Sequence, residues 1–326
     1  MHTKEYRNCH FHISLTTDSD FFFQAVDEIL DFDHAEQPST NPITIAIDIR
    51  ESRFSGSHDQ NKYLYDHRFE DNDVLGGWLG HPLGHIFSDP KQKTIRGFIS
   101  SLFKPDEFSL ERVLDIALFQ PLRYILSFHG YFFLHGSVVY NANGGILFTG
   151  PQNCGKSTLA IALLAHAFSY SNDDKVFLHN DETGITLIPL PTKIGIGNQQ
   201  LPVWQPFLEK STLSLYGNKK RFSANNLTSG ITPEKLYTKM IVFPSFEKGT
   251  PQGKITILSK EEAFQRFLQE NFNLPDKQLF SKSTPEQMML FWKLLDHSHA
   301  ILVTYNDENL LETVSSLADT LNATKS

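Results

Sequence analysis

The sequence predicts a mixed α/β fold, and three observations support this prediction. A short apolar run, a glycine-rich loop and a segment with one apolar helical face follow one another between residues 145 and 168. Runs rich in β-branched and aromatic residues alternate with helical patterns through the rest of the C-terminal part. Before residue 105, strand-like runs dominate and are separated by polar or Gly/Pro turns. We therefore expect a small α+β region at 1–104, followed by a larger α/β domain at 105–326.

The N-terminal region offers two clear strands and one helix. Residues 43–49 and 94–99 are rich in β-branched side chains, which favour strands. Residues 18–30 fit a short helix, since either Asp18 or Ser19 can cap its first turn.

The C-terminal domain begins with a helical pattern at 105–128, where Pro121 predicts a kink or a break. Strands at 131–140 and 145–148 follow, and the residues between them, 141–144, have the composition of a tight hairpin turn. A helix at 157–168 comes next. Further strands are expected at 176–178, 185–188, 194–196, 240–243, 254–258 and 300–305, and further helices at 261–271, 285–296 and 307–321.

The bulk composition favours a globular protein of the cytoplasm. Of the 326 residues, 40% are hydrophobic, and no stretch approaches the roughly 20 apolar residues of a membrane span. The N-terminus lacks the pattern of a signal peptide, and two cysteines are too few for a disulfide framework. A net charge of −8 argues against nucleic acid or an anionic membrane as a partner.

The strongest motif is G-x-x-x-x-G-K-S, which begins at Gly150 and ends at Ser157. An apolar strand precedes it and an apolar-faced helix follows it, as a phosphate-binding loop requires. Glycines let consecutive N–H groups turn inward, and the helix N-terminus adds further donors. We therefore expect a bound nucleotide. The expected nucleotide-binding residues are Gly150, Pro151, Gln152, Asn153, Cys154, Gly155, Lys156, Ser157 and Thr158.

The chemistry of this motif also predicts Mg²⁺. Lys156 would place a cation on the β- and γ-phosphates, and the Ser157 hydroxyl would bind the metal ion. The motif alone does not distinguish a kinase from an ATPase or a GTPase.

The acidic residues that accompany the loop distinguish a kinase from an ATPase or a GTPase, and the sequence offers two pairs of such residues. Asp173 and Asp174 follow the helix after the loop, where one carboxylate can bind Mg²⁺ and the other can accept the proton of an attacking hydroxyl. Their surroundings are also ordinary turn composition. Asp181 and Glu182 are the alternative pair.

Several features together resemble the HPr kinase/phosphorylase C-terminal domain and its shorter relatives. They are Leu134-His135-Gly136-Ser137 before the loop, the loop itself, Asn172-Asp173-Asp174 after it, and the stretch Pro189-Leu190-Pro191. The resemblance extends over about residues 110–320 and is specific within 134–191. It implies a core like that of phosphoenolpyruvate carboxykinase, with a mixed sheet, and it favours Asp173 and Asp174 as the acidic pair.

The resemblance further implies a kinase that uses ATP and Mg²⁺ to phosphorylate a hydroxyl group, often that of a serine. It implies catalytic roles for Lys156, Asp173, Asp174 and His135. Asp173 and Asp174 would share the base and metal roles in an order that the sequence does not assign, and the expected metal ligands are Ser157 and Asp174. The chain has Thr158 where HPr kinases have glutamate, and it lacks their C-terminal signature. The expected acceptor is therefore another protein, a peptide or a small hydroxyl compound.

A second interpretation is a binding module that uses the nucleotide to recognise a peptide or protein partner without phosphotransfer. In that case the acidic pair would be dispensable. Both interpretations are compatible with a homo-oligomer, and neither identifies the function of residues 1–104.

Overall fold

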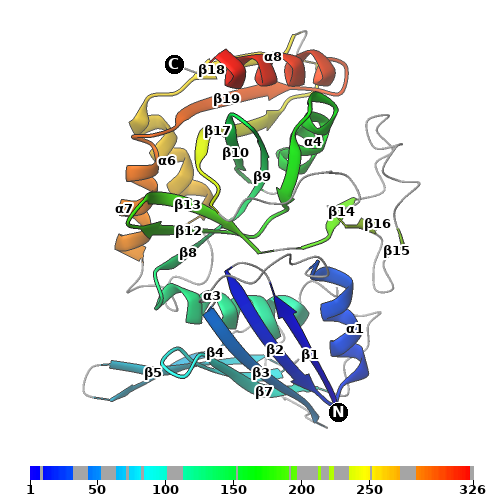
Figure 1. The fold of residues 1–326 in the computed structure, drawn as a ribbon, viewed down its shortest axis with the longest axis vertical. Helices are drawn as coiled ribbons and strands as arrows, with labels where there is room; N and C mark the ends of the chain where they lie inside the picture. Colours follow the sequence, from blue (N-terminus) through cyan, green and yellow to red (C-terminus); the bar gives the residue numbers. More distant parts are fainter. Residues whose placement is uncertain are drawn as a thin grey trace. The chain divides into compact units, whose positions relative to one another are not determined.

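The structure is a computed structural model, and it describes most of the chain. The described residues are 1–7, 10–31, 43–52, 64–70, 73–81, 84–100, 113–151, 153–190, 192–196, 212–213, 220–223, 235–249, 252–271 and 284–323. They form two compact units, the first built mainly from Met1–Tyr131 and the second mainly from the chain after it (Figure 1). Both units combine helices with sheets, and parallel and antiparallel strand pairs occur in each. The predicted mixed α/β class is confirmed.

The first unit contains a seven-stranded sheet in the order β1-β2-β3-β7-β6-β5-β4. The pairs β2–β3 and β3–β7 are parallel, and the other neighbours are antiparallel. The strands are β1 (His2–Arg7), β2 (Phe11–Thr17), β3 (Ile43–Ser52), β4 (Leu64–Glu70), β5 (Asp73–His81), β6 (Gly84–Asp89) and β7 (Thr94–Ser100).

Alternation along β2 explains how this sheet meets its helix. Phe11, Ile13 and Leu15 are buried, whereas the residues between them are only partly covered. Helix α1 (Asp20–Ile29) packs on β2, and its N-cap is Ser19, whose hydroxyl accepts the N–H of Phe22. The predicted helix is therefore present, with Ser19 rather than Asp18 as its cap.

The first unit continues beyond residue 104, where the sequence placed its end. The described part of the 105–128 pattern is a π-helical turn (Asp115–Phe119) followed by α3 (Gln120–Ser127), which packs on β6 and β7. Pro121 lies in the first turn of α3, where its missing N–H costs least. The predicted irregularity at this proline is thus a change of helix type directly before it.

The second unit is built on a six-stranded sheet in the order β11-β9-β10-β17-β19-β18. The pairs β10–β17 and β17–β19 are parallel. The strands are β9 (Gly136–Asn141), β10 (Gly144–Thr149), β11 (Ser169–Asn172), β17 (Thr238–Phe246), β18 (Lys254–Ile257) and β19 (His299–Tyr305). A second sheet of three strands contains β8 (Tyr131–Leu134), β12 (Val176–Asp181) and β13 (Gly184–Pro189). The short strands β14 (Ile194–Ile196) and β16 (Lys220–Phe222) pair with each other in a further small sheet.

Helices cover both faces of the six-stranded sheet (Figure 1). Alternate residues of β10 point to opposite faces, so Ile146 and Phe148 join one core and Leu147 joins the other. The first core includes α4 (Lys156–Ala162), a 3-10 turn (Leu163–His166) and α8 (Leu310–Ala323), and the second includes α6 (Lys260–Asn271) and α7 (Thr284–Leu294). The sequence predicted each of these helices.

The segment expected as one strand at 131–140 is divided between two sheets. Strand β8 ends at Leu134 and β9 begins at Gly136, which leaves His135 between them. Gly136 lies opposite Thr149 of β10, and a Cβ on Gly136 would lie 2.6 Å from the backbone oxygen of Phe148. Glycine is therefore required where the two strands approach.

We expect Gly136→Ala to destabilise the second unit by about 3 kcal/mol, because the obstructing atom belongs to the backbone and cannot turn aside. Gly184→Ala is the matched control, since a Cβ there meets nothing within 4 Å and only its positive φ of 122° opposes it. That control should cost about 1 kcal/mol. Urea unfolding of both variants measures the difference, and equal losses would contradict the steric explanation.

Candidate functional site

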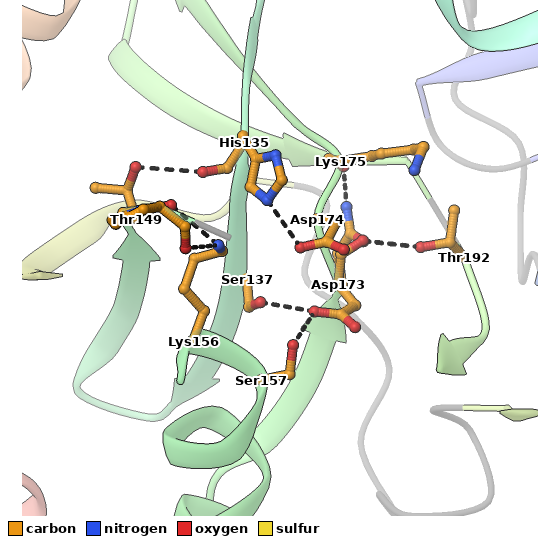
Figure 2. A network of polar contacts seen from close by, with 12 residues as sticks. His135, Ser137, Thr149, Lys156, Ser157, Asp173, Asp174, Lys175 and Thr192 are labelled. Carbon is orange, nitrogen blue, oxygen red and sulfur yellow. Dashed lines mark hydrogen bonds and ion pairs between the residues drawn. The ribbon is translucent and has the colours of Figure 1, made fainter. Parts of the chain in front are cut away.

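The segment 150–158, here called the 150–158 loop, follows β10 and includes the first three residues of α4 (Figure 2). Its backbone turns through conformations that favour glycine: φ is +154° at Gly150 and +98° at Gly155, which is the N-cap of α4. Asn153 also has a positive φ of 64°. Of the predicted loop residues, Gln152 lies outside the described residues.

Lys156 points back into the loop from the first residue of α4. Its side chain is buried, and Nζ donates hydrogen bonds to the backbone oxygens of Gly150 at 3.0 Å and Pro151 at 2.9 Å (Figure 2). The carbonyl dipoles of the loop therefore compensate the charge of the ammonium group where water is largely excluded.

Asp173 lies directly beside the loop. It follows β11, which pairs antiparallel with β9, and two hydroxyl groups donate to the same carboxylate oxygen, Oδ1. One is Ser157 of α4 and the other is Ser137 of β9, each at 2.7 Å (Figure 2). Asp173 is only 8% exposed, so these bonds supply the polar partners that a buried carboxylate needs.

Asp174 turns the other way and meets His135. Its Oδ1 lies 3.1 Å from His135 Nε2, and both side chains are partly exposed. The backbone at Asp174 has a positive φ of 64°, and the N–H of Lys175 donates to the oxygen of Asp173 across it. Such a turn costs of the order of 1–3 kcal/mol for a residue other than glycine. This local strain is what directs two consecutive carboxylates to different partners.

The two carboxylates differ in their tendency to ionise. Burial raises the pKa of Asp173, and the charge of Asp174 adds to this effect, while the Ser157 and Ser137 hydroxyls oppose it. Burial also opposes ionisation of Asp174. However, its hydrogen bond and charge interaction with His135, and then the cations Lys175 and Lys156, hold the pKa of Asp174 below its usual range.

A second layer of hydrogen bonds holds this turn in place. The Thr192 hydroxyl lies 3.1 Å from both Asn172 Oδ1 and the backbone oxygen of Asp173. Asn172 Nδ2 donates to the backbone oxygen of Lys175, which also accepts the N–H of Leu190. On the other side, Thr149 Oγ1 donates to the backbone oxygen of His135.

Sequence reasoning did not assign roles to Ser137 and Thr192. Ser137 belongs to the stretch that carried the family resemblance, and Thr192 follows Pro191 directly. Their proximity to Asp173 depends on strand pairing and on the chain path after β13. No local pattern in the sequence encodes either.

The alternative pair, Asp181 and Glu182, belongs to the turn between β12 and β13. Asp181 Oδ1 accepts the N–H of Thr183 at 2.7 Å, and Asp181 Oδ2 pairs with Lys235 Nζ at 2.9 Å. The Thr183 hydroxyl also donates to Asp181 Oδ1. These bonds are those of a hairpin turn. Of the two candidate pairs, the structure therefore brings Asp173 and Asp174 to the loop.

The oxygen atoms of Ser157 and Asp173 are suitable ligands for a hard cation. Hydroxyl and carboxylate oxygens are the ligands that Mg²⁺ prefers, and it typically takes one or two carboxylates together with substrate phosphates. In the part of the chain that the structure describes, no three His, Cys, Asp or Glu side chains gather into a metal-binding group. Also within the described residues, no helix is both long enough and apolar enough to cross a membrane.

Comparisons with known proteins give no family assignment. No protein-family model matches the chain, and no curated protein matches its sequence.

We expect Asp181→Asn to reduce the free energy of unfolding by about 1 kcal/mol at pH 7, as loss of a partly exposed ion pair does. Hydrogen bonds from Thr183 and then from Lys235 hold the pKa of Asp181 below its usual value. Because the folded state favours the ionised form, this stabilisation is fully present above the unfolded pKa of about 3.9 and decreases as the pH falls from there toward the lower pKa of the folded state. Urea unfolding at pH 7 and pH 3 should show the gap between wild type and variant closing. A gap of the same size at pH 3 would contradict the ionic explanation.

Proposed function

We propose that the protein is a kinase that uses ATP and Mg²⁺ to transfer the γ-phosphate to a hydroxyl group. One observation carries this proposal: the Ser157 hydroxyl of the 150–158 loop donates to Asp173, and Asp174 beside it pairs with His135. A phosphate-binding loop and two carboxylates in different environments then meet at one place, as phosphoryl transfer to a hydroxyl requires.

The loop would hold the phosphates. Free N–H groups at the start of α4 and the positive end of the helix dipole favour anions. Lys156 would exchange its bonds with the loop carbonyls for bonds with the β- and γ-phosphates. The remaining predicted contacts, including Asn153, Cys154 and Thr158, lie along the same loop.

Ser157 and Asp173 would hold Mg²⁺ between them and the phosphates. The sequence suggested Ser157 with Asp174, whereas the contact with Ser157 is made by Asp173, so we assign Asp173 to the metal side. Bound there, the cation would neutralise charge that develops on the phosphate oxygens.

Asp174 and His135 would then face the acceptor. The depressed pKa of Asp174 keeps this carboxylate ionised at neutral pH, and His135 orients it. In a loose transition state the acceptor hydroxyl forms little bond to phosphorus, so a weak base suffices to orient it and take its proton late. The acceptor oxygen would bond to the γ-phosphorus as the bond from phosphorus to the bridging oxygen breaks, ADP would leave, and Asp174 would accept the proton.

The class of acceptor follows from the family resemblance. We propose a serine of a protein or peptide, or a small hydroxyl compound, in the cytoplasm. On this proposal the second unit has the mixed-sheet core of phosphoenolpyruvate-carboxykinase-like kinases. The parallel strands β10, β17 and β19 and the loop at the end of β10 support that assignment.

We expect Asp174→Asn to lower phosphate transfer by a factor of about 10² to 10⁴, the usual contribution of a positioned acid–base group. Asparagine tolerates a positive φ, so the turn should be retained. ATP affinity should change little, because the loop and Lys156 are intact. The measurement is transfer from γ-labelled ATP with Mg²⁺ into proteins and small molecules of a lysate from the source organism.

Asp181→Asn is the matched control, since it makes the same change in the pair that the structure places at a hairpin turn. It should leave transfer unchanged. If wild type binds ATP but moves no label, and Asp174→Asn behaves like it, the nucleotide-dependent binding module replaces the kinase. If Asp181→Asn abolishes transfer, the acidic pair is the other one.

A further inference from the structure

The phenol of Tyr305, at the end of β19, contacts the 150–158 loop at Gly155. Tyr305 is the last residue of β19 and is 1% exposed, and its hydroxyl donates to the backbone oxygen of Gly155 at 3.1 Å. Burial raises the pKa of Tyr305, although a hydrogen bond with the Thr158 side chain opposes this effect. The phenol therefore keeps its proton at neutral pH and remains a donor.

The sheet, and not the loop, fixes the position of this ring. Strand β19 pairs in parallel with β17, and Tyr305 lies opposite Phe246 in this pair. The two rings pack edge to face, with their centroids 5.6 Å apart. The backbone oxygen of Tyr305 accepts the N–H of Glu247 at 2.9 Å. The Phe246 ring and the backbone bond to Glu247 therefore fix the position of Tyr305, and with it the position of the hydroxyl beside Gly155.

Gly155 and Tyr305 are mutually adapted. Gly155 has a φ of +98°, and a Cβ built on it would lie 1.7 Å from the Tyr305 hydroxyl oxygen. The hydroxyl thus fills the space that any other side chain at Gly155 would need. The second glycine of the motif is required here both by its backbone conformation and by the phenol.

The hydrogen bond has a consequence for the next amide. The peptide unit between Gly155 and Lys156 is planar and trans, so its C=O and N–H point in opposite directions. The oxygen is held by Tyr305 and also accepts the first helical bond of α4, from Leu159 N–H at 3.0 Å. The N–H of Lys156 is thereby directed away from the body of α4.

We infer that Tyr305 is a positioning residue for the nucleotide, because it fixes the Lys156 N–H as a phosphate donor. This inference rests on the proposed function. A donor that is already oriented does not lose freedom on binding, so the affinity for the phosphates increases. On this inference Tyr305 would act through Gly155 and would not itself bind a phosphate.

Tyr305→Phe tests this role, since it removes the hydroxyl and keeps the ring. The dissociation constants of ATP and ADP, measured by calorimetry well below the unfolding temperature, should both rise by about five- to tenfold. In the transfer assay, KM for ATP should rise more than kcat falls. In protein without nucleotide, hydrogen exchange of the amides in 150–158 should become faster.

Tyr237→Phe is the control, because it removes a tyrosine hydroxyl that bonds Thr183 in the same unit, at the β12–β13 turn. It should leave nucleotide affinity and loop exchange unchanged. Unchanged dissociation constants and exchange in Tyr305→Phe, or equal changes in both variants, would overturn the inference. If the wild type does not bind ATP at all, the proposed function fails. The exchange measurement would then still decide whether Tyr305 fixes the loop.

Discussion

The hydrogen bonds of one buried carboxylate, that of Asp173, connect the end of β11 to β9 and to the start of α4. Asp173 Oδ1 accepts hydrogen bonds from the hydroxyl groups of Ser137 on β9 and Ser157 on α4. A carboxyl group with so little exposure needs such partners, because water cannot supply them. Meeting this requirement fixes the end of β11 against β9 and brings the start of α4 to the same point. The position of the loop relative to the acidic turn follows from that junction.

The same junction explains why two adjacent aspartates differ. Asp173 lies inward, where burial favours its neutral form, and Asp174 lies outward beside His135, where neighbouring cations favour the charged form. The strained backbone at Asp174 separates the two side chains. On the proposed function the two carboxylates would take separate tasks: Asp173 would help to hold a cation, whose charge would favour the ionised form of this carboxylate, and Asp174 would accept a proton.

Local patterns predicted much of this arrangement, and long-range pairing decided the rest. The loop, its strand and its helix follow from glycine spacing and apolar periodicity, because both act over a few residues. The division of 131–140 at His135 was missed, since an apolar run does not indicate which of two sheets each half joins. Ser137, Thr192 and Tyr305 were missed for a related reason: their partners lie 19 or more residues away and are brought near only by the sheet order. For the N-terminal sheet the sequence predicted only individual strands. The order of the strands, and which pairs are parallel, leave no pattern in the sequence.

On the proposed function, the bonds that Lys156 makes to its own loop would also affect the enthalpy of nucleotide binding. A phosphate bound there would have to displace the oxygens of Gly150 and Pro151 from the Lys156 ammonium group. The enthalpy gained at this residue is therefore the difference between two sets of hydrogen bonds and not the sum of one. What the exchange does change is charge, because a neutral carbonyl gives way to an anionic oxygen. The affinity of a ligand at Lys156 would then depend on its negative charge. A weakly charged ligand would gain little, because the backbone oxygens of Gly150 and Pro151 already accept hydrogen bonds from this ammonium group.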